Sequence, residues 1–301
     1  MRPSTGFKTR WAELLPHEFK RRLADCPIVF LPLGICEPHG QVSALGLDTF
    51  KAEWLCEQAA LTVGGIVAPS MGYHIHETGY HARWLEDEVG EENPHMTGIP
   101  PTAMLYLFLY QLRAFANAGF RGIVVVSGHS GGNQVDLRTA AELFIREVRD
   151  VQVWVRSDPE LVEGLYEGDH AGKYEISQLM YLRPDLIDMS AKALEKEPNA
   201  GGRLALGADA EEASPELGKA IMEACMESVC KQAWAMKEEF EATVVTPPRI
   251  GYDTIERIWA ELLRSSRHWT TANPWPSQAP VSDRSQWKPY EHYRVKEAEP
   301  E

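Results

Sequence analysis

A carboxylate, an imidazole and a second carboxylate occur close together in the stretch 28–50. The apolar run 28–33 is typical of a buried strand, and Glu37, His39 and Asp48 follow it before the next apolar-periodic segment. Residues two apart in an extended segment project to the same side, so Glu37 and His39 can point into one space. Asp48, at the start of a helix, can close over that space. Oxygen and imidazole nitrogen together suit hard and borderline divalent metals.

Two simpler interpretations of this stretch stay open. Asp48 could cap the helix that follows it, which is a common use of aspartate. The segment Glu-Pro-His-Gly could be an ordinary turn, because proline and glycine interrupt regular structure.

Further ionisable side chains follow two later strands of the predicted sheet. His129 comes directly after the apolar strand 122–126, and His170 and Glu175 follow the strand 151–155 through a longer loop. Open parallel sheets bind ligands outside the carboxyl ends of their strands. A loop histidine or an exposed helical glutamate would explain each cluster alone, but three clusters at one edge favour a functional site.

Strands alternate with helices along the chain, which predicts an α/β fold with a parallel sheet. The segment 70–101 lacks regular periodicity, and its histidines and Trp84 favour a functional loop. The tail from residue 267 is rich in tryptophan and proline and suits an extended arm. Apolar patterning predicts strands at 27–33, 66–68, 122–126 and 151–155, and helices at 50–61, 102–117, 134–149, 215–240 and 255–263.

Composition excludes several classes of protein. The 301 residues are 44% hydrophobic and 25% charged, as in a soluble globular protein, and the formal net charge is −14. That charge argues against a nucleic-acid or an anionic-membrane partner. The five cysteines form no C-x-x-C pair, and neither a leader nor a membrane-spanning run is apparent. We therefore expect a cytoplasmic protein.

The order of motifs resembles the creatininase (creatinine amidohydrolase) family. These motifs are LPLG-x-x-E-P-H-G, then Asp48, then GFRGIVVVSGHSGGN, then DHAGKYEIS, and the resemblance covers roughly residues 25–240. It implies a three-layer α/β/α sandwich with a mostly parallel central sheet. It also implies two divalent metal ions per subunit, with zinc, manganese and iron left open, and a homo-oligomer, commonly a hexamer.

The resemblance assigns a role to each matched residue. It implies that Glu37 binds one metal, that His39 binds the other, and that Asp48 bridges both. His129 would complete the first metal site, and His170 matches the catalytic histidine. Glu175 would act at the site either as a ligand or as a group that supports one. The implied reaction is hydrolysis of a non-peptide C–N bond in a small or cyclic amide by a metal-activated water, with His170 as proton donor.

The sequence also departs from the family pattern. Gly131 stands where creatininase proper has a glutamate that acts at the second metal, so we do not expect creatinine as substrate. The segment 73–99 looks longer than the family's usual loop, and we predict that it forms a lid over the substrate. The candidate substrate-binding residues are Trp84, His76, Ser130 and Gly131. We expect a catalytic domain at 1–245 and, at 246–301, a helix and an arm packed on the domain or a neighbouring subunit.

Two alternatives belong to other classes of protein. Gly128 to Gly132 matches G-x-S-x-G between a strand and a helix, so Ser130 could be a nucleophile with Asp169 and His268 as partners. That interpretation leaves the carboxylates and histidine of the first stretch unexplained. A non-catalytic metal- or ligand-binding protein on the same fold is the second alternative, because a fold does not prove an activity.

Overall fold

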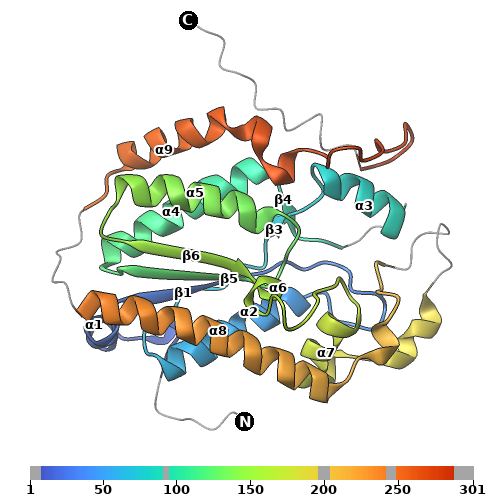
Figure 1. Cartoon of the computed structure of the whole chain (residues 1–301), viewed down its shortest axis with the longest axis horizontal. Helices are drawn as coiled ribbons and strands as arrows, with labels where there is room; N and C mark the ends of the chain where they lie inside the picture. The colour runs from blue at the N-terminus through green and yellow to red at the C-terminus, as the bar shows by residue number, and fades with distance from the viewer. Residues whose placement is uncertain (1–7, 91–94, 196–203, 242–248, 288–301) are drawn as a thin grey trace, which may run out of the picture.

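A four-stranded, fully parallel sheet lies at the centre of the protein. The computed structural model describes residues 8–90, 95–195, 204–241 and 249–287. Val29 pairs with Ile66, and Gly122 pairs with both Ile28 and Gln152, which sets the register of the sheet. The spatial order is β2 (Ile66–Val67), β1 (Ile28–Leu33), β5 (Gly122–Ser127) and β6 (Gln152–Ser157) (Figure 1).

Helices cover both faces of this sheet, which confirms the predicted three-layer α/β/α sandwich (Figure 1). Alternate strand residues point to opposite faces, so Val29 joins one hydrophobic core and Phe30 the other. Both are fully buried, as expected for strands covered on two sides. One face carries α4 (Pro101–Ala118), α5 (Asn133–Glu147) and α9 (Tyr252–Arg264), and the other carries α2 (Leu47–Thr62), α7 (Lys173–Leu182) and α8 (Pro215–Glu241).

The helix boundaries follow local rules. Proline occupies the first position of α4 and of α8, where its missing N–H costs no hydrogen bond. Gly119 ends α4 in the left-handed region with a φ of 105°. The remaining elements include α1 (Pro16–Asp25), α6 (Asp158–Leu161) and short 3-10 turns at Trp11–Glu13, Pro184–Leu186, Met189–Leu194, Ala210–Glu212, Ser266–His268 and Thr270–Ala272. Among the described helices, none is both long and apolar enough to span a lipid bilayer.

The segment 70–101 is more regular than its sequence pattern predicts. It contains β3 (His74–Ile75), which pairs in parallel with β4 (Gly98–Ile99), and the helix α3 (Tyr80–Glu88). The buried face of α3 includes Tyr80 and His81, which hydropathy counts as polar or ambiguous. The pattern of apolar residues therefore does not show the helical period of α3, because polar side chains form part of its buried face.

The chain after α9 lies along α5 and α3. Asp136 of α5 accepts hydrogen bonds from the backbone N–H groups of Thr270 and Thr271, both at 2.9 Å. Further on, Trp275 stacks on Tyr80 with ring centroids 4.2 Å apart. Trp287 donates its indole N–H to the carbonyl oxygen of Gly90 over 2.9 Å. The described part of the predicted arm thus lies against α3, whereas residues 288–301 lie outside the described residues.

Candidate metal centre

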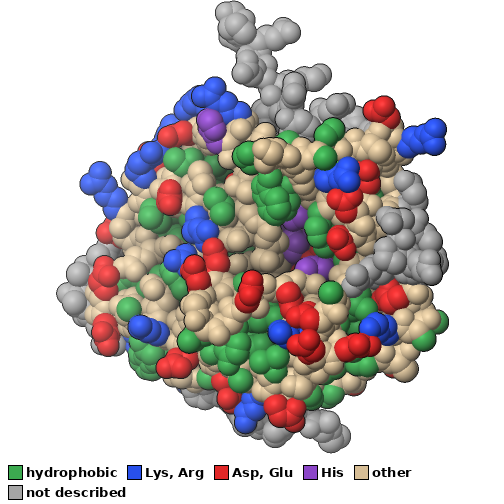
Figure 2. All heavy atoms as spheres, turned by 45° about the vertical axis from the view of Figure 1, so that its right-hand side comes forward, with side chains coloured by type: hydrophobic (Ala, Val, Ile, Leu, Met, Phe, Trp, Pro, Cys, Tyr) green, Lys and Arg blue, Asp and Glu red, His purple; other side chains and the backbone are tan. Residues whose placement is uncertain are grey.

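The five predicted metal ligands meet at the carboxyl edge of the sheet. Glu37 and His39 follow β1, and His129 follows β5. Asp48 lies in the first turn of α2, and Glu175 lies in the first turn of α7. All five side chains are buried. Figure 2 shows histidine side chains at the bottom of a hollow in this face of the molecule.

The first group of ligand atoms comes from Glu37, Asp48 and His129. Nδ1 of His129 lies 2.7 Å from Oε1 of Glu37 and 3.4 Å from Oδ2 of Asp48. Asp48 does not cap its helix, since Gly46 is the N-cap residue and no side chain bonds there. Its carboxylate therefore faces the other ligands.

The second group comes from His39, Asp48 and Glu175. Nε2 of His39 lies 3.5 Å from Oδ1 of Asp48 and 3.3 Å from Oε2 of Glu175. Asp48 thus presents one oxygen to each group. Two sets of three ligands that share one carboxylate could hold two ions side by side.

Hydrogen bonds orient the histidine rings. Nδ1 of His39 lies 3.1 Å from the carbonyl oxygen of Glu37, and Nε2 of His129 lies 3.2 Å from that of Ile75. Each of these nitrogens must donate its proton, because a carbonyl oxygen only accepts. The other nitrogen of each neutral ring is then free of a proton and faces carboxylates. Metal-binding histidines are held by a carbonyl in this way.

Among the described residues, the buried carboxylates of the site outnumber its one lysine. Lys51, one helical turn after Asp48, places Nζ 3.3 Å from Asp48 Oδ1, 3.3 Å from Asp158 Oδ1 and 2.5 Å from Glu175 Oε1. One ammonium group therefore faces three carboxylates, and Glu37 adds a fourth nearby. Uncompensated charge in a dry site is costly, so the cluster favours further cations.

The pKa values of the buried histidines fall into two classes. Burial lowers the pKa of His129, but the charge of Glu37 and contacts with Asp48 outweigh burial and raise it to about 10. Asp48 and Glu175 likewise overcome burial and raise the pKa of His39 well above its usual value. Burial dominates at His74 and His81, where it holds the pKa well below the usual value. The surroundings of His129 and His39 therefore favour a positive charge at these two rings.

The donors present fit divalent metal ions. Both oxygens of Asp48 and Nε2 of His39 are buried without a hydrogen-bond partner in the described structure. A buried polar atom without a partner costs about 1–3 kcal/mol, and more for a charged group. One ion at each group would give all three of these atoms a partner. Zinc, manganese and iron all accept carboxylate and imidazole ligands.

A glycine brings the two loops of the site into contact. A Cβ atom at Gly128 would lie 1.9 Å from the carbonyl oxygen of Asp48, so only glycine allows this approach. The close contact holds the loop carrying His129 against the start of α2.

His170 lies beside the second group. Its ring stacks on His39 with centroids 4.7 Å apart, and its Nδ1 is 3.9 Å from Oε2 of Glu175. Nε2 lies 3.0 Å from the carbonyl oxygen of Pro38, and Trp84 meets the ring edge-on at 4.9 Å. His170 is half-buried, so it faces both the ligand groups and the hollow.

The predicted substrate-binding residues surround the first group. Nε2 of His76 lies 2.9 Å from Oε2 of Glu37, and the His76 ring lies 5.7 Å from Trp84. Nδ1 of His76 accepts the N–H of Glu77, so the proton on Nε2 faces the carboxylate. Ser130 and Gly131 are both half-buried in the loop after His129.

The proposed serine triad does not assemble. The Asp169 carboxylate accepts backbone N–H groups from Gly172, Tyr174 and Glu175, and so supports the start of α7. His268 is exposed and bonds to Arg267. Within the described part of the chain, no hydrogen bond joins Ser130, Asp169 and His268.

Two side chains of the site were missed in the sequence analysis. Lys51 and Asp158 look like surface residues by type, whereas Tyr80 and His81 lie in the segment 70–101 that the sequence already indicated as functional. The spacing of Lys51, one helical turn after Asp48, was the one available indication.

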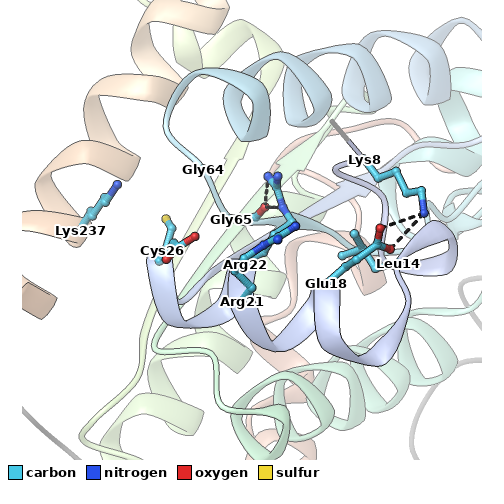
Figure 3. Close-up of a pocket in the computed structure, with 10 residues that line it drawn as sticks. Lys8, Leu14, Glu18, Arg21, Arg22, Cys26, Gly64, Gly65 and Lys237 are labelled. Atoms are coloured by element: carbon cyan, nitrogen blue, oxygen red, sulfur yellow. Dashed lines mark hydrogen bonds and ion pairs between the residues drawn. The ribbon is translucent and has the colours of Figure 1, made fainter. Parts of the chain in front are cut away.

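A separate cavity of about 250 Å³ lies at the amino ends of the strands, between α1 and the chain before β2 (Figure 3). Two of the basic side chains that line it already have partners. Lys8 pairs with Glu18 at 3.0 Å, and Arg22 donates to the carbonyl oxygen of Gly65 at 2.7 Å. None of the predicted site residues lines this cavity.

Replacing Lys51 with methionine should destabilise the metal-free protein by about 3–5 kcal/mol. The change keeps an unbranched side chain but leaves buried carboxylates without their ammonium partner. Bound metal should reduce the loss, because it supplies the missing charge. Urea unfolding with and without metal measures both effects. Lys192→Met, which breaks an exposed pair with Glu211, is the control and should change stability by about 0–1 kcal/mol. Equal stability of both variants would contradict the prediction.

Metal binding should release about two protons per chain at neutral pH. In the metal-free protein the raised pKa values keep His39 and His129 protonated there, and both must lose a proton to bind metal. Protonation stabilises the metal-free protein below the unfolded pKa of about 6.5, and this contribution is lost as pH rises toward 10. Metal affinity should therefore rise with pH over the same window.

Calorimetry in buffers of different ionisation enthalpy measures this proton release. Binding heats that do not depend on the buffer would contradict it.

The fold and the site together define a class of protein. An α/β/α sandwich with paired carboxylate–imidazole groups at the carboxyl edge of a parallel sheet is the arrangement of a metal-binding hydrolase.

The comparisons with known proteins identify the family. The model of the family described as "Creatininase: Creatinine amidohydrolase" matches residues 12–233. The creatinine amidohydrolase of Pseudomonas putida is 28% identical over 267 residues, covering 77% of this chain and 97% of that protein. The crystal structure of a creatinine amidohydrolase superposes with a TM-score of 0.63 at 25% identity, covering 78% and 99% of the two chains. A mutant creatininase of Zn-Zn type gives a TM-score of 0.61 at 25% identity, covering 78% and 99%. This chain belongs to the creatininase family, whose members are metal-dependent amidohydrolases.

Proposed function

We propose that this protein hydrolyses a non-peptide C–N bond of a small or cyclic amide with two divalent metal ions, and that creatinine is not its substrate. The observation that carries the proposal is the pair of carboxylate–imidazole groups that share Asp48. Both oxygens of that buried carboxylate lack hydrogen-bond partners. Structural ion pairs satisfy their oxygens, so this arrangement favours bound metal.

The ligand roles follow from the geometry. Glu37, Asp48 and His129 would hold one ion, and His39, Asp48 and Glu175 would hold the other. When bound, the ions would polarise the amide carbonyl and lower the pKa of a water molecule toward roughly 7, so that it attacks at neutral pH. This arrangement supports Glu175 as a ligand, positioned further by the N–H of Ala171 and by Lys51.

The remaining residues handle the proton and the substrate. His170 would take a proton at Nδ1 from the attacking water and pass it to the leaving nitrogen, because Nε2 donates to the carbonyl oxygen of Pro38 and leaves Nδ1 as an acceptor beside Glu175. His76 would keep the Glu37 carboxylate in place. Trp84 would form one wall for the substrate ring, and the chain around Ser130 and Gly131 another.

Gly131 supports a substrate other than creatinine. The position carries no carboxylate, and α3 occupies the space next to it, as the contacts of Tyr80 and His81 show. A substrate that depends on an acidic group there would lose both its contact and its room.

Metal analysis followed by an amide-hydrolysis screen tests the proposal. We expect about two metal ions per chain, full loss of activity after chelation, and recovery on adding metal back. Creatinine should be turned over very weakly or not at all. Two bound ions without turnover of any amide would favour the non-catalytic alternative. Activity that survives chelation would refute the metal mechanism.

The assembly belongs to the same proposal. We propose a homo-oligomer, with a hexamer as the expected form, built from a catalytic domain at 1–245 and a helix and arm at 246–301. Support comes from α9, whose Ile255 and Ile258 join the same core as β1, and from exposed aromatic side chains at Trp234 and Tyr252. Light scattering of the purified protein measures the mass, and a monomer at micromolar concentration would contradict it.

A further inference from the structure

Helix α3 fills the space that a side chain at position 131 would need. Gly131 has a φ of 113°, and a Cβ atom there would lie 2.5 Å from Oη of Tyr80 and 2.6 Å from Nε2 of His81. Both distances are too short for a side chain unless the Tyr80 and His81 side chains move. The loop that follows His129 therefore meets a phenol and an imidazole where creatininase proper would place a carboxylate.

Tyr80 and His81 are both buried, and each has one polar atom without a hydrogen-bond partner in the described part of the chain. Tyr80 is 4% exposed and His81 is 5% exposed. Among the described residues, neither Oη of Tyr80 nor Nδ1 of His81 has a hydrogen-bond partner. Each orphaned atom costs about 1–3 kcal/mol, so a bound molecule that pairs with them would recover that energy.

Contacts with the C-terminal arm hold Tyr80 in position beside His81. Trp275 stacks flat on the Tyr80 ring at 4.2 Å, and Gln278 donates its side-chain amide to the Tyr80 carbonyl oxygen at 3.0 Å. The Tyr80 and His81 rings lie 4.1 Å apart. Because packing already fixes these side chains, binding a ligand costs little further side-chain entropy.

His81 is not needed as a metal ligand. Each proposed ion already has three protein ligands, which is the usual number for a catalytic site. His81 comes near other imidazoles at His76 and His129, but the proton on Nε2 of His76 faces Glu37. His81 thus lies outside both proposed ligand groups, with Nδ1 unpartnered among the described residues.

The neighbouring cations are already paired. Arg83 of α3 forms an ion pair with Asp87 at 2.6 Å, and Lys51 lies among three carboxylates. A carboxylate on the substrate would therefore find no arginine or lysine from these two helices. A phenol and an imidazole instead suit an uncharged group that both donates and accepts hydrogen bonds.

We propose that Tyr80 and His81 form a subsite for an uncharged, hydrogen-bonding substituent of the substrate, such as a hydroxyl group on a small ring. The subsite rests on the proposed function, because it places this substituent next to the amide that the metal ions would act on. It also explains why this chain carries glycine at position 131, since a side chain there would displace Tyr80 and His81 from the subsite.

Three lactams that differ in one substituent test the subsite by calorimetric titration of the metal-loaded protein. The probes are 2-pyrrolidinone, 4-hydroxy-2-pyrrolidinone and pyroglutamate, which carry no substituent, a hydroxyl group and a carboxylate. We expect the hydroxyl probe to bind about tenfold more tightly than the unsubstituted ring, and pyroglutamate to bind more weakly than either. Tyr80→Phe should remove the tenfold advantage and leave the affinity for 2-pyrrolidinone within about twofold.

Controls separate this inference from its foundations. Tyr110→Phe removes a hydroxyl that bonds Glu256 on the surface, and should change no affinity. His81→Ala should weaken binding of the hydroxyl probe and keep the metal content. Loss of metal in His81→Ala would make His81 a ligand and overturn the subsite. Tightest binding of pyroglutamate, no preference for the hydroxyl group, or no binding of any probe would also overturn it. A wild-type protein that holds no metal would instead refute the proposed function.

Discussion

The Asp48→Asn variant should lose metal from both ligand groups and lower turnover by about 1000-fold, which corresponds to roughly 4 kcal/mol of transition-state stabilisation. Asp48 belongs to both groups, with Oδ2 3.4 Å from His129 and Oδ1 3.5 Å from His39. Asparagine keeps the volume but removes the charge and replaces one carboxylate oxygen with an NH2 group that cannot ligate. The side chain is 1% exposed, so water cannot take its place easily.

Metal stoichiometry separates a shared ligand from an ordinary one. We expect about two ions in the wild-type protein, about one in Glu37→Gln, and close to none in Asp48→Asn. Asp253→Asn changes an exposed aspartate in α9 and is the matched control, which should keep both ions. Full metal content in Asp48→Asn would refute the shared role of Asp48 and with it the pair of ions.

A chain that ends at Asn273 should retain its metal and lose most of its activity. The truncation removes the stack of Trp275 on Tyr80 and the bond from Trp287 to Gly90, together with the Arg83 bond to the carbonyl oxygen of Pro280. It keeps the anchor of Thr270 and Thr271 on Asp136, and the buried Trp269. The candidate metal ligands lie in the loops after β1 and β5 and in the first turns of α2 and α7, so we expect them to stay in place without the removed segment.

We expect kcat/KM to fall by about 100-fold, because α3 would no longer hold Tyr80, His81 and Trp84 in place. Burying a tryptophan contributes roughly 3–5 kcal/mol, so the melting temperature should fall by about 10 °C. A chain that ends at Trp287 is the control and should keep both activity and stability. Normal kinetics in the shorter chain would show that the arm does not support the substrate wall, and loss of metal would show that it supports the ligands.

Sequence pattern alone was sufficient for the framework of this protein. The apolar runs 28–33 and 122–126 predicted β1 and β5, and the alternation of strands and helices predicted an α/β fold with a parallel sheet. The three-layer α/β/α arrangement was implied by the resemblance to the creatininase family. Because parallel strands end at one edge of a sheet, the sequence predicted that Glu37, His129 and Glu175 lie at the same edge. These inferences succeed because periodicity and strand direction are local properties of the chain.

Tertiary structure decided the electrostatics and the shape of the site. The contacts of Lys51 with Asp158 and Glu175 join residues more than 100 positions apart, and no local pattern records such a pairing. The same holds for α3, where Tyr80 and His81 lie against Gly131 while Trp275 of the C-terminal arm stacks on Tyr80. Sequence types and spacing determined which side chains could bind metal. Which charges face one another, and which space remains for a substrate, depended on how distant segments pack, because burial and distance set the strength of every polar contact.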